Sequence, residues 1–289
     1  MKKNKHRAFL KWAGGKYGLI EDIQRHLPEG DVLIEPFVGA GSVFLNTDYP
    51  HYVLNDINPD LIALYGILKT QADAYIADAK TLFTAANNDP DVYYSLRQEF
   101  NDSQDPYQRS LLFLYLNRHG YNGLCRYNLS GKFNVPFGRY KAPYFPQQEL
   151  YRFAEKAQRA TFTCEPYANT FKKAQRDHVM YCDPPYAPIS KTAYFTQYAG
   201  NGFSLDDQAN LADLAHKAMR EKGVCVLISN HDTVDTRAYY RHAQLTTLQV
   251  KRTISQKGKG RKKVGELLAL YSPVADMATA DKETAGMTL

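Results

Sequence analysis

The chain has few cysteines, the residues that build disulfide frameworks and most structural zinc sites. Only four of its 289 residues are cysteine, at Cys125, Cys164, Cys182 and Cys225, and none of them shows the paired spacing of a zinc site. We therefore expect no metal, and we interpret the cysteines as thiols in a reducing compartment. The basic N-terminus lacks the apolar stretch of a signal peptide, and no run approaches the ~20 apolar residues of a membrane helix. These absences predict a cytoplasmic protein.

The sequence has no internal repeats, and its composition is not that of a disordered chain. Apolar residues make up 44% and charged residues 23% of the chain, which is typical of a globular domain. The chain contains one tryptophan, 22 tyrosines and 14 phenylalanines. This aromatic content suits stacking surfaces, although most such rings belong to a core. The length suffices for one large α/β domain with an inserted subdomain, or for two modest domains.

Positive charge is in excess and clustered. The net charge is +6 and the isoelectric point is near 8.9. Basic residues gather in three stretches, residues 2–7, 118–141 and 251–263. One such stretch is as consistent with a solvated face as with a binding surface, but three together favour a polyanionic partner, and nucleic acid is the first candidate.

The pattern of apolar runs predicts an α/β fold. Residues 31–46 have the order strand, glycine turn, helix, and a second strand at 52–55 makes the start of a βαβ unit, which predicts a parallel sheet. A helix is expected over residues 205–222. Further strands are expected at 161–164, 179–182, 224–228, 245–250 and 267–271, the last two joined by a loop rich in Gly and Lys around residues 257–260.

A segment of different character interrupts this alternation. Between residues 59 and 117, apolar residues recur at helical spacing in four stretches, 61–70, 72–83, 92–100 and 108–117. Residues 126–129 and 132–135 flank a Ser-Gly turn and predict a basic hairpin. We therefore predict a discontinuous catalytic domain (1–58 and 142–272), an inserted recognition domain (59–141) and a disordered tail (273–289).

A glycine turn follows the first predicted strand. The FxGxG spacing of Phe37, Gly39 and Gly41 lets the backbone approach a ligand, and Asp56 at the end of the next strand suits the hydroxyls of a ribose. The third glycine of a dinucleotide fingerprint is missing, as is a phosphate-binding loop, so NAD and ATP are disfavoured. Together with Asp56 the pattern favours another nucleoside cofactor, although FxGxG alone is more typical of an ordinary strand-to-helix turn.

The tetrad Asp-Pro-Pro-Tyr, residues 183–186, directly follows the apolar run 179–182. The amine of a nucleobase is a poor nucleophile until acceptors localise its lone pair. Asp183 offers a carboxylate and Pro184 a carbonyl, while Tyr186 can stack on a base. The alternative is a Pro-Pro turn with a surface tyrosine.

The only tryptophan lies in a third unusual stretch, residues 11–16, where a Gly-Gly bend separates two lysines.

Four motifs together resemble bacterial DNA adenine methyltransferases, and they occur in the same order. They are KWAGGK at residues 11–16, EPFVGAG at 35–41, NRHGYNGLCR at 117–126 and DPPY at 183–186. The resemblance runs from about residue 9 to residue 271. It implies a Rossmann-like sheet that binds S-adenosylmethionine (SAM), an inserted helical and β-hairpin recognition domain, and methylation of adenine N6 in GATC of double-stranded DNA.

Carried across position by position, the resemblance implies a role for each matching residue. Asp183, Pro184 and Tyr186 would be catalytic. SAM would be bound by Trp12, Lys16, Phe37, Gly39, Asp56 and Asp183. Lys11 and Arg126 would recognise guanines, Tyr121 and Asn122 would open the duplex, and Leu124 and Pro136 would touch bases. The phosphates would be held by Arg97, Arg118, Asn128, Asn134, Arg139 and Lys141.

Two kinds of alternative remain open at the level of sequence. Related tetrads also serve methylation of cytosine N4, RNA adenine and protein glutamine, and only the basic hairpin favours duplex DNA. A DNA-binding module that has lost catalysis is a rival of another class, which the intact Asp183 and Tyr186 disfavour. We further expect a monomer in solution, in the bacterial cytoplasm and associated with the nucleoid.

Overall fold

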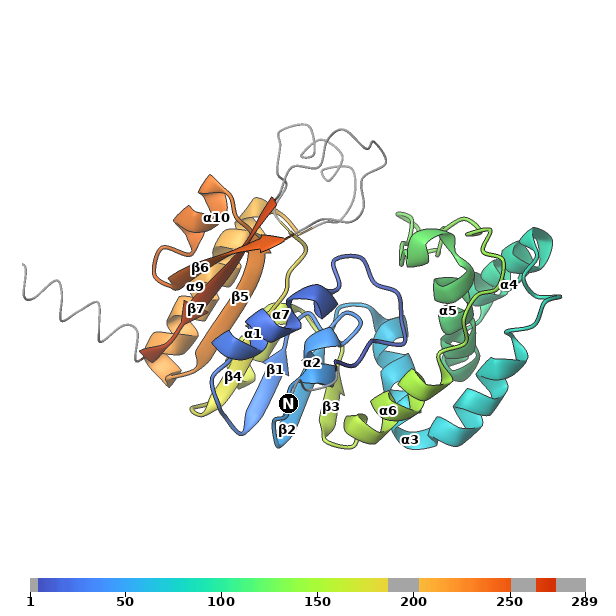
Figure 1. Ribbon diagram of the computed structural model, residues 1–289, viewed down its shortest axis with the longest axis horizontal. Helices are drawn as coiled ribbons and strands as arrows, with labels where there is room; N and C mark the ends of the chain where they lie inside the picture. The colour runs from blue at the N-terminus through green and yellow to red at the C-terminus, as the bar shows by residue number, and fades with distance from the viewer. Residues whose placement is uncertain (1–4, 187–202, 251–263, 274–289) are drawn as a thin grey trace, which may run out of the picture. The chain divides into compact units, whose positions relative to one another are not determined.

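Seven strands form one mixed sheet in the computed structural model, in the order β3-β2-β1-β4-β5-β7-β6 (Figure 1). The structure describes residues 5–186, 203–250 and 264–273. The whole basic stretch 251–263, the predicted tail except Pro273, and the first residues of the N-terminal cluster lie outside these ranges. The chain divides into two compact units, residues 1–22 with 38–165 (unit 1) and residues 23–37 with 166–289 (unit 2). The predicted domain boundaries follow a different division and stay a prediction.

Unit 2 contains five of the strands and also the Asp-Pro-Pro-Tyr sequence. β1 (Val32–Glu35), β4 (His178–Cys182) and β5 (Cys225–His231) are parallel neighbours, with Leu33 opposite Val179 and Met180 opposite Val226. β7 (Val264–Tyr271) pairs antiparallel with β5 and with β6 (Gln244–Val250), which makes the sheet mixed rather than wholly parallel. All five strands lie where apolar runs predicted them.

Helices cover these strands within unit 2. α9 (Leu205–Lys222) packs against β5 and β7 and contacts α7 (Tyr167–Lys173) and α10 (Val234–Tyr239). α9 has the predicted bounds because local signals fix both ends. Ser204 and Asp207 form a capping box at its start, and Gly223 ends it with a φ of 70°.

Unit 1 joins a short piece of sheet to a group of helices. β2 (His51–Asn55) pairs in parallel with β3 (Ala160–Thr163), and α2 (Ser42–Asn46) precedes β2. Before these elements come η1 (Lys16–Leu19) and α1 (Ile20–His26), the latter crossing into unit 2. The remaining elements are α3 (Pro59–Thr81), α4 (Pro90–Asp102), α5 (Pro106–His119), η2 (Tyr121–Gly123) and α6 (Gln147–Ala157).

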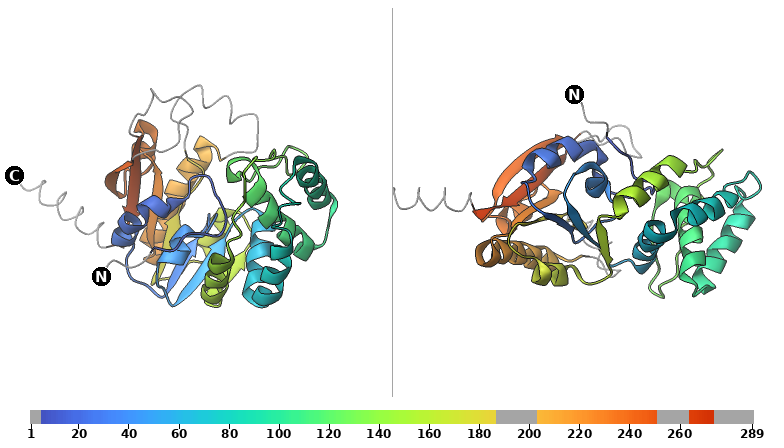
Figure 2. Two further views of the ribbon diagram at one scale, coloured as in Figure 1. Left: turned by 45° about the vertical axis from the view of Figure 1, so that its right-hand side comes forward. Right: turned by 90° about the horizontal axis from the view of Figure 1, so that it is seen from below.

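The helices of the inserted segment pack mainly on one another. α3 packs against α5 and α6, and α4 packs on α5; these cyan to green helices lie together in both views of Figure 2. Each of α3, α4 and α5 begins with proline after an Asn or Asp whose side chain accepts backbone N–H bonds. These caps are Asn58, Asp89 and Asp105.

The predicted break between two helices of this segment is confirmed, whereas the predicted hairpin needs correction. The helices predicted at 61–70 and 72–83 are the two parts of α3, which has a kink at the non-helical backbone of Gln71 (φ −140°, ψ 38°). The hairpin at 126–135 exists, but its arms contain isolated pairing rather than regular strands: Tyr127 faces Phe133, and Gly120 faces Phe137. The Asn and Gly residues of the segment favour turns over extended ladders, which explains the difference.

Candidate functional site

The glycine turn of unit 1 lies against the tryptophan. Gly39 and Gly41 have positive φ angles of 48° and 71°, so the turn depends on glycine at these positions. A Cβ atom on Gly39 would lie 2.9 Å from Nε1 of Trp12. The Tyr65 hydroxyl donates to the Gly39 carbonyl at 2.5 Å. Two motifs separated in sequence therefore meet in one place.

Asp56 lies at the same turn. Its Oδ2 accepts the Gly39 N–H at 3.1 Å, and its Oδ1 accepts the Asn58 N–H at 3.0 Å. Burial raises the pKa of the Asp56 carboxyl, while the backbone donors oppose that shift. Lys16, also assigned to the cofactor, is 5% exposed and donates from Nζ to the Gly14 carbonyl at 3.1 Å. Unit 1 thus brings Trp12, Gly39 and Asp56 together.

The tetrad of unit 2 follows β4 directly. Ser229 on β5 donates from Oγ to Oδ1 of Asp183 at 3.3 Å, and the Tyr181 hydroxyl lies 2.9 Å from the same Oγ. Pro184 is buried and Asp183 is half-buried. Because parallel strands end at the same edge, β4 presents Asp183 where β5 can orient its carboxylate.

Tyr186 is fixed by two residues that sequence reasoning missed. Its hydroxyl donates to the carboxylate of Glu266 on β7, and the His231 ring lies edge-on with a centroid separation of 4.4 Å. Burial raises the pKa of Tyr186 well above its usual value, with Asp183 and Glu266 adding to the shift. The signal for His231 was present in the polar sequence SNHD at residues 229–232, where a parallel strand ends.

The backbone of the tetrad has its own support. Gln208, fully buried on α9, donates from Nε2 to the Pro185 carbonyl at 2.7 Å and accepts from Asn230 Nδ2 at 2.8 Å. Phe37, assigned to the cofactor, packs with Tyr167 and Phe203 at centroid distances of 5.3 and 5.6 Å. Both groups of contacts lie within unit 2.

Lys11 lies beside Asn117 and the turn 121–123, which are more than 100 residues away in sequence. Asn117 bonds both the N–H and the carbonyl of Lys11, at 2.9 and 2.8 Å, and also the Gly123 carbonyl at 3.3 Å. A Cβ atom on Gly123, whose φ is 61°, would lie only 2.2 Å from Cβ of Lys11. The lysine therefore packs directly on the turn 121–123.

The ammonium group of Lys11 contacts Tyr140, another residue that sequence reasoning missed. Nζ lies 3.9 Å from the centre of the Tyr140 ring and donates to the Arg118 carbonyl at 3.2 Å. Burial, and then the charge of Arg118, lower the pKa of Lys11. The Tyr140 hydroxyl accepts the Asn122 N–H at 3.0 Å. Tyr140 thus connects a predicted base-recognition residue with a predicted duplex-opening residue.

The turn itself is exposed and conformationally special. Tyr121 is 41% exposed, and Asn122 is exposed with a left-handed backbone (φ 53°, ψ 17°). The Tyr121 N–H donates to the Pro136 carbonyl at 2.8 Å, which ties the turn to the exposed Pro136. Leu124, directly after the turn, is half-buried. An exposed aromatic on a fixed turn suits insertion into a base stack.

The structure brings Arg126 and Asn134 together across the hairpin. Arg126 is exposed and donates to the Oδ1 and the carbonyl of Asn134 at 2.7 and 3.1 Å. Asn128 is exposed, and its Oδ1 accepts the N–H groups of Ser130 and Lys132 within the turn. Asn128 therefore shapes the hairpin as well as facing solvent.

The basic residues assigned to phosphates fall into two groups. Arg97 donates to the Val135 carbonyl and Arg118 to the Tyr144 carbonyl, each at 3.0 Å. Each guanidinium therefore already uses one donor in a bond within unit 1. Arg139 and Lys141 are exposed, and Arg139 has a φ of 54°. The second group fits contact with a polyanion more directly than the first.

Within residues 5–186, 203–250 and 264–273, no three His, Cys, Asp or Glu side chains are grouped as a metal site would require. Over the same residues, none of the helices combines the length and the apolar character needed to cross a membrane.

Comparison with known proteins identifies the class of enzyme. Residues 12–254 match the family described as D12 class N6 adenine-specific DNA methyltransferase, so the chain belongs to this family. This finding confirms the resemblance to bacterial DNA adenine methyltransferases and the predicted enzyme class.

Similar curated proteins share the family and nearly the full length of the chain. It is 65% identical over 269 residues to a DNA adenine methylase of Vibrio cholerae, covering 93% of this chain and 97% of the relative. It is 64% identical to that of Serratia marcescens (94% and 100%) and 62% to that of Escherichia coli K12 (94% and 97%). A precorrin-6y C5,15-methyltransferase structure from Geobacter metallireducens aligns with a TM-score of 0.36 at 8% identity, covering 88% and 86%.

Proposed function

We propose that this protein transfers a methyl group from SAM to N6 of the adenine in GATC sites of double-stranded DNA. The observation that carries the proposal is the tetrad at the end of β4, where Ser229 orients Asp183 and Glu266 holds Tyr186. The high identity to DNA adenine methylases supports the choice of adenine in DNA.

The residues of unit 1 fit the proposed cofactor. SAM supplies an electrophilic methyl group and carries an adenosine whose ribose hydroxyls donate hydrogen bonds. The Asp56 carboxylate is an acceptor at the end of β2, and the left-handed Gly39 keeps the turn free of a side chain. Trp12 adds an aromatic wall beside this turn. We assign Lys16, Phe37 and Asp183 to the same cofactor on the resemblance alone.

Activation of the amine follows from the chemistry of the tetrad. The target adenine is stacked inside a duplex and must be flipped out before it can react. Tyr186 then stacks on the base, and Glu266 fixes the plane of the ring. The Asp183 carboxylate and the Pro184 carbonyl accept hydrogen bonds from the two N–H groups of the amine. These bonds localise the nitrogen lone pair and direct it toward the methyl group. Positioning and electrostatic stabilisation of the charge that develops on nitrogen supply the acceleration.

Recognition of GATC is assigned to unit 1. Lys11 and Arg126 present cationic donors suited to the O6 and N7 acceptors of guanine. Tyr121 and Asn122 lie on an exposed turn that can enter the stack, and Leu124 and Pro136 flank that turn. Arg97, Arg118, Asn128, Asn134, Arg139 and Lys141 are assigned to phosphates. We further propose that the protein acts as a monomer in the bacterial cytoplasm, on nucleoid DNA.

The test is methyl transfer by the purified protein with labelled SAM. We expect label in a GATC duplex, and little in a duplex with a scrambled site, in RNA, or in DNA whose adenines are replaced by cytosine. Transfer to cytosine or RNA instead would overturn the choice of acceptor. Gel filtration of the same preparation tests the monomer.

Asp183→Ala should abolish transfer while leaving DNA affinity nearly unchanged, because the assigned DNA-binding residues all lie in unit 1. Affinity is measured by fluorescence anisotropy of a labelled duplex. Asp213→Ala, which removes an exposed carboxylate of the same unit, is the matched control and should keep full activity. Retained turnover in Asp183→Ala would refute the assigned role.

A further inference from the structure

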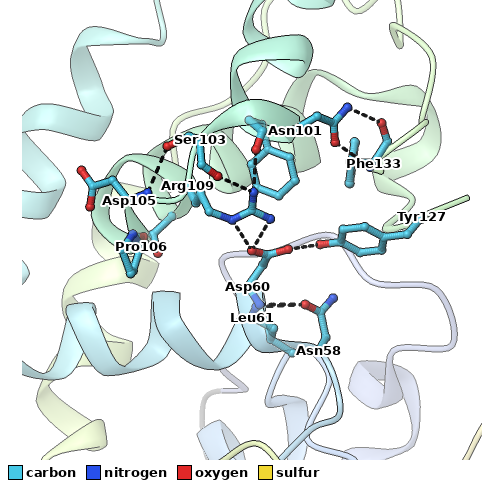
Figure 3. A network of polar contacts seen from close by, with 12 residues as sticks. Asn58, Asp60, Leu61, Asn101, Ser103, Asp105, Pro106, Arg109, Tyr127 and Phe133 are labelled. Carbon is cyan, nitrogen blue, oxygen red and sulfur yellow. Dashed lines mark hydrogen bonds and ion pairs between the residues drawn. The ribbon is translucent and has the colours of Figure 1, made fainter. Parts of the chain in front are cut away.

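Asp60, at the start of α3, connects the helices of unit 1 to the hairpin (Figure 3). Its Oδ1 accepts from Nε and Nη2 of Arg109 at 2.9 and 2.7 Å. Its Oδ2 accepts from the Tyr127 hydroxyl at 2.6 Å. The carboxylate is 8% exposed, so both of its oxygens are bonded in a site that water barely reaches.

Arg109 fixes Asp60 in place. Its Nη1 donates to the carbonyls of Phe100 and Ser103 at 2.6 and 3.0 Å, and its guanidinium carbon lies 4.2 Å from the centre of the Phe100 ring. A buried charge pair with satisfied donors has one favoured geometry, since any displacement leaves a charge without a partner. Asp60 therefore offers Tyr127 an acceptor at a defined position.

Arg126 is flanked by two residues that bond to the start of α3. Tyr127, directly after it, bonds Asp60. Cys125, directly before it, accepts from Nδ2 of Asn58 at 3.4 Å, and Asn58 also caps α3 by accepting from Asp60 N–H and Leu61 N–H. The chain is thus held on both sides of Arg126 by the first turn of one helix.

The hairpin depends on such outside contacts. Its arms pair at Tyr127 and Phe133 and share two further backbone bonds, from Asn128 N–H to the Lys132 carbonyl at 2.9 Å and from Asn134 N–H to the Arg126 carbonyl at 3.1 Å, and so short a ladder is only marginally stable by itself. The opposite arm is held by Asn101, which donates to the Phe133 carbonyl at 3.1 Å and accepts its N–H at 2.7 Å (Figure 3). Burial also raises the pKa of Tyr127, which keeps its hydroxyl protonated as a donor.

Register decides where Arg126 points. Successive residues of an extended arm face opposite sides, so anchoring Tyr127 inward turns Arg126 outward. Tyr127 is half-buried while Arg126 is exposed, as this alternation requires. A slip of one residue would turn the guanidinium away from solvent and away from Asn134, its partner across the hairpin.

We propose that Asp60 and Tyr127 are specificity-determining positioning residues, which set the register of the hairpin so that Arg126 meets its guanine. The proposal rests on the proposed function, because it takes Arg126 as the residue that recognises that base. Neither residue touches DNA in this role; they act through Arg126.

The test is Tyr127→Phe, which removes one hydroxyl and keeps the ring. The readout is the ratio of kcat/KM on a GATC duplex to kcat/KM on duplexes with either guanine replaced. For the duplex that lacks the guanine recognised by Arg126, we expect this ratio to fall about tenfold, within the range of one lost base contact. KM for SAM should stay unchanged, because Asp56 keeps its own partners.

Tyr75→Phe is the matched control. The Tyr75 hydroxyl is also buried in unit 1, where it donates to the Ser110 carbonyl at 2.9 Å, but it contacts no part of the hairpin through that bond. Its loss should lower thermal stability while keeping the specificity ratio. An equal fall of the ratio in both variants would show general loosening and overturn the proposal.

A second comparison places Tyr127→Phe in an Arg126→Ala background. If Tyr127 acts through Arg126, it should change the ratio no further there. An additional loss would mean that Tyr127 acts elsewhere, and an unchanged ratio in the single variant would overturn the proposal directly. Failure of the proposed function is separate, because the wild-type protein would then show no preference for GATC.

Discussion

At the scale of single residues, the exposed Arg126 and the neighbouring basic residues have different expected roles. Arg126 is aligned by the side chain and carbonyl of Asn134, as a base-recognition residue should be. Lys141 is exposed on the chain that leaves the segment, where it can approach phosphates without a fixed geometry. Geometry thus separates a directed contact from a general one.

Arg126→Ala should relax the choice of base at one guanine, with a loss of about 1 to 3 kcal/mol of discrimination there. Lys141→Ala should weaken binding to cognate and scrambled duplexes alike and reduce the salt slope by about one. Binding titrations at several salt concentrations measure both. Equal losses of Arg126→Ala on the two duplexes would make Arg126 a phosphate contact.

Which residues of the site could be predicted depended on whether their partners are local. Asp183 and Gly39 stood in recognisable motifs, because strand ends and glycine turns are fixed by neighbouring residues. Tyr140 and Glu266 stood in none, since each acquires its role from a contact made across the fold. Sequence reasoning therefore named the proposed reacting groups and missed the residues that hold them.

At the scale of elements, local sequence signals predicted helix ends better than the positions of the hairpin arms. The capping box of Ser204 and Asp207, with Gly223 at the other end, sets the bounds of α9. The hairpin has a local signal at its turn, but the contacts that position its arms come from Asp60 and Asn101 elsewhere in unit 1. Local chemistry thus predicted the bounds of α9 and the place of the hairpin turn, but not the contacts that hold the arms.

Ser204→Ala should lower the free energy of unfolding by about 1 kcal/mol, because Asp207 N–H loses its 3.0 Å acceptor at the start of α9. Urea unfolding followed by circular dichroism measures the change. Ser95→Ala, at an exposed position inside α4, is the control and should cost nothing, since alanine favours helix interiors. A cap that contributes nothing would give the two variants equal stability.

At the scale of the whole molecule, a buried histidine links stability to pH. His119 is 1% exposed, is stacked on Tyr115 at 3.9 Å, and lies 3.0 Å from the Tyr115 carbonyl through Nδ1. Burial lowers its pKa to about 4, with Lys11 and Arg118 adding to the shift. The folded chain therefore keeps this ring neutral at pH values where the unfolded chain protonates it.

This stabilisation should be complete above the ordinary histidine pKa of about 6.5 and should be lost progressively as pH falls to about 4, for a total of at most about 3 kcal/mol. His119→Gln removes the titrating group, so its unfolding free energy should decline less over that interval. Urea unfolding at a series of pH values gives the comparison. Parallel pH profiles for the variant and the wild-type protein would contradict the assignment.

The sequence by itself determined the strand ends, the glycine turn, the tetrad and the family. Each of these is encoded in a few consecutive residues, so they can be recognised without the fold. Only the tertiary structure decided that Lys11 packs on Gly123, that Glu266 holds Tyr186, and that Asp60 anchors the residue beside Arg126. Those contacts join residues 67 to more than 100 positions apart, and such pairs are set by packing rather than by local pattern.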